Sequence, residues 1–296
     1  MPLVLILLGA LAACASILTF TWWAAGNVER SRGRRVGPLH LTIGFATNFF
    51  DTLGIGSFAP TTAVFRLARL VPDELIPGTM IVGHALPVVT QAMIFISAVE
   101  VDPWQLTILI AACVGGGWIG AGLVASWSRR VVRVAMATAL LAAAALMLLG
   151  LLGLYPAGGT ATTFTPVGLA VATCLSILFG ALLTIGIGNY APSLILFSVL
   201  GMDPRAAFPI MMGSGAFVAS VAGVRFIRSG RFDRRAALGL TLGGIPGVMV
   251  AAWVVQSLPL DALRWLVLVV VCYAAVTLLR PDATAYNEAP IRSRPA

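Results

Sequence analysis

Two stretches of the sequence combine residue types that could bind an anion: TLGIGSFAPT at residues 52–61 and TIGIGNYAPS at residues 184–193. In each, two glycines allow backbone angles that other residues avoid. Ser57 and Asn189 then offer side chains that cap helix N-termini, and a proline follows within the first turn, where its missing N–H is harmless. The pattern predicts a helix that breaks and restarts. The free N–H groups and positive dipole of the new N-terminus suit an anion.

Both breaks lie inside long apolar runs, where irregular backbone is tolerated only if it is buried in protein or lines a wet cavity. We therefore predict that the two restarting helices meet near the middle of a membrane and bind substrate there. The predicted substrate-binding residues are Gly54, Gly56, Ser57, Phe58, Ala59, Gly186, Gly188, Asn189, Tyr190 and Ala191.

Ionisable side chains within apolar runs are candidates for function. Asp51 directly precedes the first break, and His84 lies in the stretch VGHALPVVTQ. We predict proton coupling at Asp51, with His84 assisting. The plainer alternatives are a helix-end acceptor or arginine partner for Asp51, and a hydrogen-bonded packing residue for His84. Further polar side chains could support an oxyanion: Asn48, Thr52, Gln91, Thr184 and Ser214.

The composition bounds the class of protein. Of 296 residues, 59% are hydrophobic and 10% are charged, which is typical of a polytopic helical membrane protein. Runs of about 20 apolar residues argue against a transmembrane barrel, whose strands alternate in polarity. The net charge of +8 comes from arginines clustered between the runs, so we expect no nucleic acid. The four cysteines and two histidines show no metal-ligand spacing, so we expect no metal, no cofactor and no enzyme activity.

The sequence also repeats itself. A shift of 132 residues aligns the two halves without a gap, placing Gly54 on Gly186 and Asp51 on Leu183. Glycines and prolines kept in register over this distance indicate an internal duplication. The predicted parts are an N-terminal helix with a basic loop at 1–35, repeat 1 at 36–156, repeat 2 at 157–280 and a polar tail at 281–296.

Arginine clusters at 30–35, 129–133 and 228–235 should face the cytoplasm. They predict seven crossings, at 3–25, 77–99, 104–126, 131–154, 206–227, 236–257 and 262–279. The runs 37–70 and 166–200 then enter and leave on one face each, as re-entrant hairpins from opposite sides. Residues 166–184 alone are long enough to cross, which is the alternative for that run. The fold class is therefore all-α and polytopic: one N-terminal helix and two inverted repeats of about four helical segments, each with a broken or re-entrant hairpin. The N-terminus would lie outside and the C-terminus in the cytoplasm.

Small residues at helical spacing predict close packing of helices. They occur in GGGWIGAG at 115–122 and at Gly243, Gly244 and Gly247.

Three stretches carry a resemblance to a known family: IGFATNFFDTLGIGSFAPTTAVFRL, LIPGTMIVGHALP and IGIGNYAPSLILFSVLG. They are similar to the TauE/SafE family of sulfite and organosulfonate exporters, over about residues 38–280. The resemblance implies a multi-pass inner-membrane carrier that moves small sulfur-containing anions outward, driven by the proton gradient. The second repeat departs from the first, because Leu183 and Ala216 stand where Asp51 and His84 would recur.

We therefore expect a secondary transporter of sulfite or a small sulfonate. Its partners would be that oxyanion, protons and the lipid bilayer, with a homo-oligomer left open. A passive anion channel and a carrier for a carboxylate remain alternatives. An intramembrane enzyme would need a nucleophile with a base, or a set of metal ligands, and the sequence shows neither pattern. A scaffold protein would not explain two buried breaks.

Overall fold

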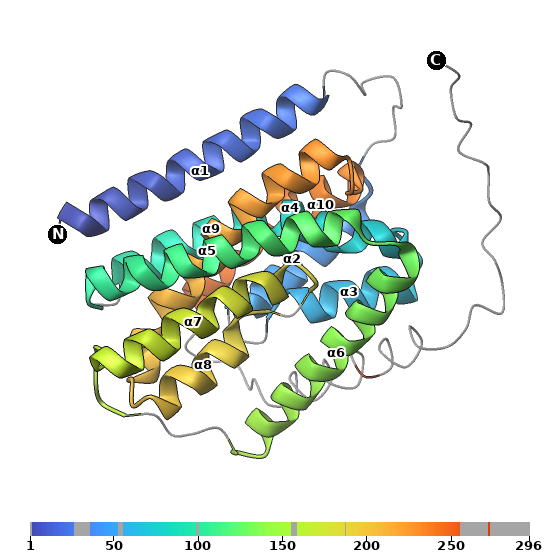
Figure 1. Ribbon diagram of the computed structural model, residues 1–296. Helices are drawn as coiled ribbons and strands as arrows, with labels where there is room; N and C mark the ends of the chain where they lie inside the picture. Colours follow the sequence, from blue (N-terminus) through green and yellow to red (C-terminus); the bar gives the residue numbers. More distant parts are fainter. Residues whose placement is uncertain are drawn as a thin grey trace.

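The chain folds as a bundle of helices, shown in Figure 1 as a computed structural model. The structure describes residues 2–26, 36–52, 56–98, 101–154, 159–186, 188–254 and 272. Within them the helices are α1 (Pro2–Gly26), α2 (Pro38–Thr52), α3 (Phe58–Leu67), α4 (Ile76–Ala98), α5 (Pro103–Ser126), α6 (Arg129–Leu151), α7 (Pro166–Leu183), α8 (Tyr190–Val199), α9 (Pro204–Ser229) and α10 (Arg234–Val254). A short 3₁₀ turn, η1 (Asp73–Leu75), precedes α4. No strand occurs among these residues, where one isolated bridge joins Ala161 to Met202.

Six helices in the described ranges are long and apolar enough to cross a membrane, so the chain is a multi-pass membrane protein. The spans are Leu3–Ala25, Asp73–Ala98, Pro103–Ser126, Pro166–Leu183, Ala206–Ser229 and Arg234–Trp253. The expected crossing at 262–279 lies outside the described residues, apart from Cys272. Because Pro166–Leu183 qualifies as a span, the re-entrant interpretation of 166–200 stays a prediction.

The centre of the bundle is formed by α4 and α9, which pack against each other. Their spans are 72% and 89% buried, whereas that of α1 is 17% buried, and α1 runs along one side of the bundle (Figure 1). The helices α2 and α3 are 15 and 10 residues long, and α8 also has 10. At about 1.5 Å per residue, each is shorter than the ~30 Å hydrocarbon core. Of these short helices, α2 packs mainly on α10, α3 contacts α4, and α8 contacts α9.

Close contacts through glycine join two pairs of helices, as the small-residue pattern predicts. A Cβ at Gly116 would overlap the backbone carbonyl of Ile177, which fixes α5 against α7. In the same way, a Cβ at Gly243 would overlap the carbonyl of Leu41, which fixes α10 against α2. Gly115 differs, because a Cβ there would meet open space. The prediction is therefore confirmed for Gly116 and Gly243 and wrong for Gly115.

Helix starts and loops on one side of the bundle are tied by polar side chains. Asp102 caps α5 by accepting from Gln105 N at 2.8 Å, and Thr165 caps α7 by accepting from Gly168 N at 3.1 Å. The Gln105 amide binds both backbone groups of Phe164, at 2.8 and 3.1 Å. These bonds fix the start of α7, and hence the direction in which it approaches the second break.

Candidate functional site

Both predicted breaks are present. The first separates α2, which ends at Thr52, from α3, and the second separates α7 from α8. Gly56 has φ +89° and Gly186 has φ +108°, angles that side chains avoid and that glycine tolerates. Gly188, the repeat partner of Gly56, is not among the described glycines with positive φ, so the two breaks differ in backbone path. Gly54 lies outside the described residues.

The capping chemistry differs from the prediction. Ser57 and Asn189 do occupy the residue before each helix, but neither side chain caps it. Their backbones are helical, at φ −90°, ψ −30° and φ −76°, ψ −7°, whereas a capping residue is typically extended. Asn189 Nδ2 instead donates to Met211 O at 3.2 Å. Ser57 Oγ is buried without a hydrogen-bond partner.

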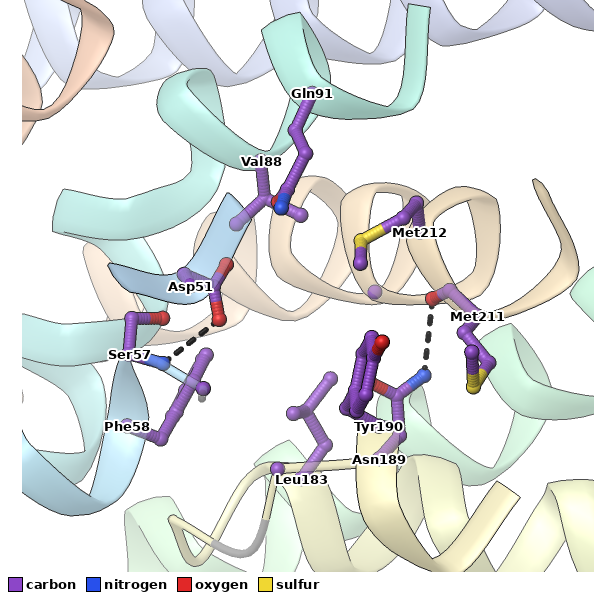
Figure 2. A pocket seen from close by; sticks show the side chains of 13 residues that line it. Asp51, Ser57, Phe58, Val88, Gln91, Leu183, Asn189, Tyr190, Met211 and Met212 are labelled. Atoms are coloured by element: carbon purple, nitrogen blue, oxygen red, sulfur yellow. Dashed lines mark hydrogen bonds between the residues drawn. The ribbon is translucent and has the colours of Figure 1, made fainter. Parts of the chain in front are cut away.

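One cavity of about 40 Å³ collects residues from both breaks and from the central helices (Figure 2). The starts of α3 and α8 lie on it, with α4 and α9 across from them. Its lining is Asp51, Gly56, Ser57, Phe58, Val88, Gln91, Leu183, Gly188, Asn189, Tyr190, Met211, Met212 and Gly215. Segments more than a hundred residues apart in the sequence thus share a single small space.

The start of α3 leaves backbone donors near this cavity. Helical hydrogen bonding begins with Thr61 N, which donates to Ser57 O at 3.1 Å. Pro60 has no N–H, and the N–H groups of Phe58 and Ala59 precede that first bond. In α8 the equivalent first bond runs from Ser193 N to Asn189 O at 3.1 Å.

Asp51 is held at the mouth of the first break by neutral donors. Its Oδ1 accepts from Ser57 N at 2.7 Å (Figure 2). The Gln91 amide satisfies two neighbours in one orientation: its nitrogen donates to Asp51 Oδ2 at 3.1 Å, and its oxygen accepts from Thr52 N at 3.3 Å. No ion pair joins Asp51 to a described residue, so no cation among them balances its charge. An ionisable group placed this way in a membrane protein is a candidate for function.

His84 belongs to a separate, closed network. Its Nδ1 lies 3.0 Å from Asn48 Oδ1, and its Nε2 lies 3.0 Å from Thr61 Oγ1. Asn48 uses its Nδ2 to donate to Gly44 O at 2.8 Å, so its oxygen must accept from His84 Nδ1–H. Thr61 then donates to the unprotonated Nε2. The network ties α2, α3 and α4 together, and its link to the cavity is Phe58, whose ring centroid is 5.6 Å from that of His84.

Part of the predicted site therefore lies on the cavity and part does not. The predicted residues on it are Gly56, Ser57, Phe58, Gly188, Asn189, Tyr190, Asp51 and Gln91. Those away from it are Ala59, Gly186, His84, Asn48, Thr52, Thr184 and Ser214. Two hydroxyls among them are bound to their own helices: Thr52 donates to Asn48 O, and Thr184 donates to Ala181 O. Ala191 is the second residue of α8.

Sequence reasoning did not single out five lining residues: Val88, Leu183, Met211, Met212 and Gly215. The repeat alignment could have found Leu183, because it is the partner of Asp51 and the two face one cavity. Within the described residues there is no cluster of three His, Cys, Asp or Glu that could hold a metal ion.

A sequence model of the family described as sulfite exporter TauE/SafE matches residues 168–296. The resemblance to TauE/SafE is thereby confirmed for residues 168–296, and for the earlier part of the chain it stays a prediction. The TauE/SafE match covers the second break and the helices after it, less than half of the chain. The printed description of that family is a sulfite exporter, which is a transporter and not an enzyme. Comparison with curated proteins and with solved structures gave no match.

Proposed function

We propose that the chain is a proton-coupled secondary transporter that exports sulfite or a small sulfonate across the inner membrane. The observation that carries the proposal is the cavity shared by both breaks and Asp51. The TauE/SafE match supports the substrate class. The orientation, with the N-terminus outside and the C-terminus in the cytoplasm, rests on the arginine clusters.

The anion would bind against the helix N-termini. The described residues that line the cavity include no arginine, so backbone N–H groups must supply the positive potential. The N–H groups at the start of α3 and the amide of Asn189 at the start of α8 lie at the two sides of this space (Figure 2). Aligned helix dipoles favour negative charge at these ends, an effect that is stronger away from water.

Asp51 couples proton binding to anion binding because its carboxylate and the anion use the same hydrogen-bond donors. Its carboxylate takes the Ser57 N–H and lies within the cavity, so it both repels an anion and competes with it. Protonation removes the repulsion and weakens the hold on Ser57 N. Proton and anion therefore favour each other's binding and move together, so export follows the outward concentration gradient of the anion and takes a proton out with it. The Gln91 amide, which reaches the other carboxyl oxygen, positions Asp51 for this exchange.

The pairing of helices supports two inverted repeats at 36–156 and 157–280. Under the 132-residue shift, α2 corresponds to α7 and α5 corresponds to α10. In the fold α2 packs on α10, and α7 packs on α5, so each broken helix lies against a helix of the other repeat. The pairing of α4 with its equivalent α9 at the centre follows the same relation. Alternating access would rock these units about the cavity. A homo-oligomer stays a prediction.

The test is sulfite flux into proteoliposomes that hold the wild-type protein or Asp51→Asn, with protein-free liposomes as the blank. An acidic exterior should drive uphill sulfite uptake by the wild type, and Asp51→Asn should lose the uphill component. Full uncoupled flux in both proteins would instead identify a passive channel. Absence of sulfite flux with folded wild-type protein would overturn the substrate and require carboxylates to be tried.

A further inference from the structure

The two halves of the chain contribute unequally to the wall of the cavity. Met212 on α9 lines it, whereas its repeat partner on α4, Met80, does not. Met80 is fully buried elsewhere, where Thr62 Oγ1 lies 2.9 Å from its sulfur. One thioether of a symmetric pair thus faces the site, and the other is fixed in the core.

The volume of the cavity, about 40 Å³, distinguishes between the two substrates under consideration. A single water needs roughly 10–15 Å³ by this measure, so about 40 Å³ holds about three water-sized groups. Sulfite, with three oxygens on one sulfur, is of that size. An organosulfonate keeps the three oxygens and adds a carbon chain, for which this volume leaves no room.

Met212 contributes a long, flexible side chain to this wall. Figure 2 shows its side chain extending from α9 into the space between Val88 and Tyr190. Tyr190 is fixed by Phe208, with ring centroids 5.7 Å apart and planes at 60°. The opposite wall is the start of α3 and its backbone donors. A methionine is flexible and unbranched, so its removal enlarges the space without disturbing the donors.

We propose that Met212 determines substrate size, so that the site takes a four-atom inorganic oxyanion and excludes organosulfonates. The inference rests on the proposed function and narrows its substrate class. The oxyanion would lie with its oxygens toward the helix N-termini. The Met212 thioether would occupy the space that the carbon chain of a sulfonate requires.

The experiment compares sulfite and ethanesulfonate uptake in proteoliposomes for the wild type, Met212→Ala and the matched control Met80→Ala. The wild type should carry sulfite and little ethanesulfonate. Met212→Ala should raise the ratio of ethanesulfonate to sulfite uptake by about tenfold or more, the scale on which a hydrophobic pocket discriminates one or two carbons. Met80→Ala should leave the ratio unchanged. Met212→Val should shift it in the same direction by less, which keeps the test available if the alanine variant does not fold.

The outcomes separate this inference from the function on which it rests. Equal uptake of both anions by the wild type would overturn the size limit while leaving the transporter intact. An unchanged ratio in both Met212 variants would overturn the role of Met212. A folded wild type that carries neither anion would refute the proposed function, and the size limit with it.

Discussion

The replacement Asp51→Asn tests the coupling scheme most sharply, because it keeps the shape and removes the charge. An asparagine at this position retains an oxygen that can accept from Ser57 N, the 2.7 Å bond that ends at Asp51 Oδ1. A carboxylate and a bound monoanion about 4 Å apart repel by ~4 kcal/mol at an effective dielectric of about 20. That repulsion corresponds to about a thousandfold in affinity. In the proposed scheme the wild type avoids this repulsion by taking up a proton at Asp51 when the anion binds.

The expected result is a difference in pH dependence. Wild-type sulfite affinity should fall as pH rises, by up to about tenfold per pH unit once Asp51 must be protonated for binding. Asp51→Asn should bind tightly throughout, without this added slope. Sulfite itself titrates, but that contribution is common to both proteins and cancels in the ratio of their dissociation constants.

The assay is isothermal titration calorimetry of detergent-solubilised protein at several pH values. Asp102→Asn is the matched control, because Asp102 caps α5 away from the cavity and asparagine caps equally well. This control should follow the wild type. A ratio of wild-type to Asp51→Asn dissociation constants that stays constant with pH would refute the coupling role of Asp51.

Three further predictions follow from the same contacts. Gln91→Leu leaves Asp51 Oδ2 without its hydrogen-bond donor. We expect gradient-driven sulfite flux to fall by about tenfold, consistent with about 1–3 kcal/mol for a lost hydrogen bond to a buried group. Flux through Gln91→Glu should be as low as flux through Gln91→Leu. Gly116→Ala forces a methyl into the backbone of α7 and should lower the melting temperature in detergent, at a cost of about 1–3 kcal/mol, whereas the neighbouring Gly115→Ala should not. His84→Leu removes the hydrogen bonds to Asn48 and Thr61 and should also lower the melting temperature. The predicted assistance of His84 in coupling requires that the variant also change the number of protons moved per sulfite. An unchanged number would limit His84 to a packing role.

The positions of the breaks were predictable because glycine and proline act locally. α3 begins at Phe58 and α8 begins at Tyr190, each directly after the residue that the pattern marks as the helix start. The chemistry of those starts was not predictable in the same way. Whether Ser57 or Asn189 caps its helix depends on its backbone angles, which are helical here, and Asn189 bonds to Met211 O on α9 instead.

The polar part of the site was visible in the sequence, and the apolar part was not. Asp51 and Gln91 stand out because charged and amide groups are rare in apolar runs. Met212 and Val88 lie in long apolar helices, where neighbouring residues have the same character and no periodicity marks the face toward a cavity. Likewise His84 could be recognised as unusual, but only the hydrogen bonds to Asn48 and Thr61 show that its ring is already satisfied.

The central claim, a sulfite site formed by both breaks and used for carrier transport, is tested most directly by counterflow. Proteoliposomes are loaded with unlabelled sulfite, diluted into a trace of radiolabelled sulfite, and sampled over time. We expect the label to accumulate transiently above its external concentration, because a carrier exchanges internal for external anion at one alternating site. Uptake that only equilibrates, without an overshoot, or no uptake by the folded protein, would contradict the claim.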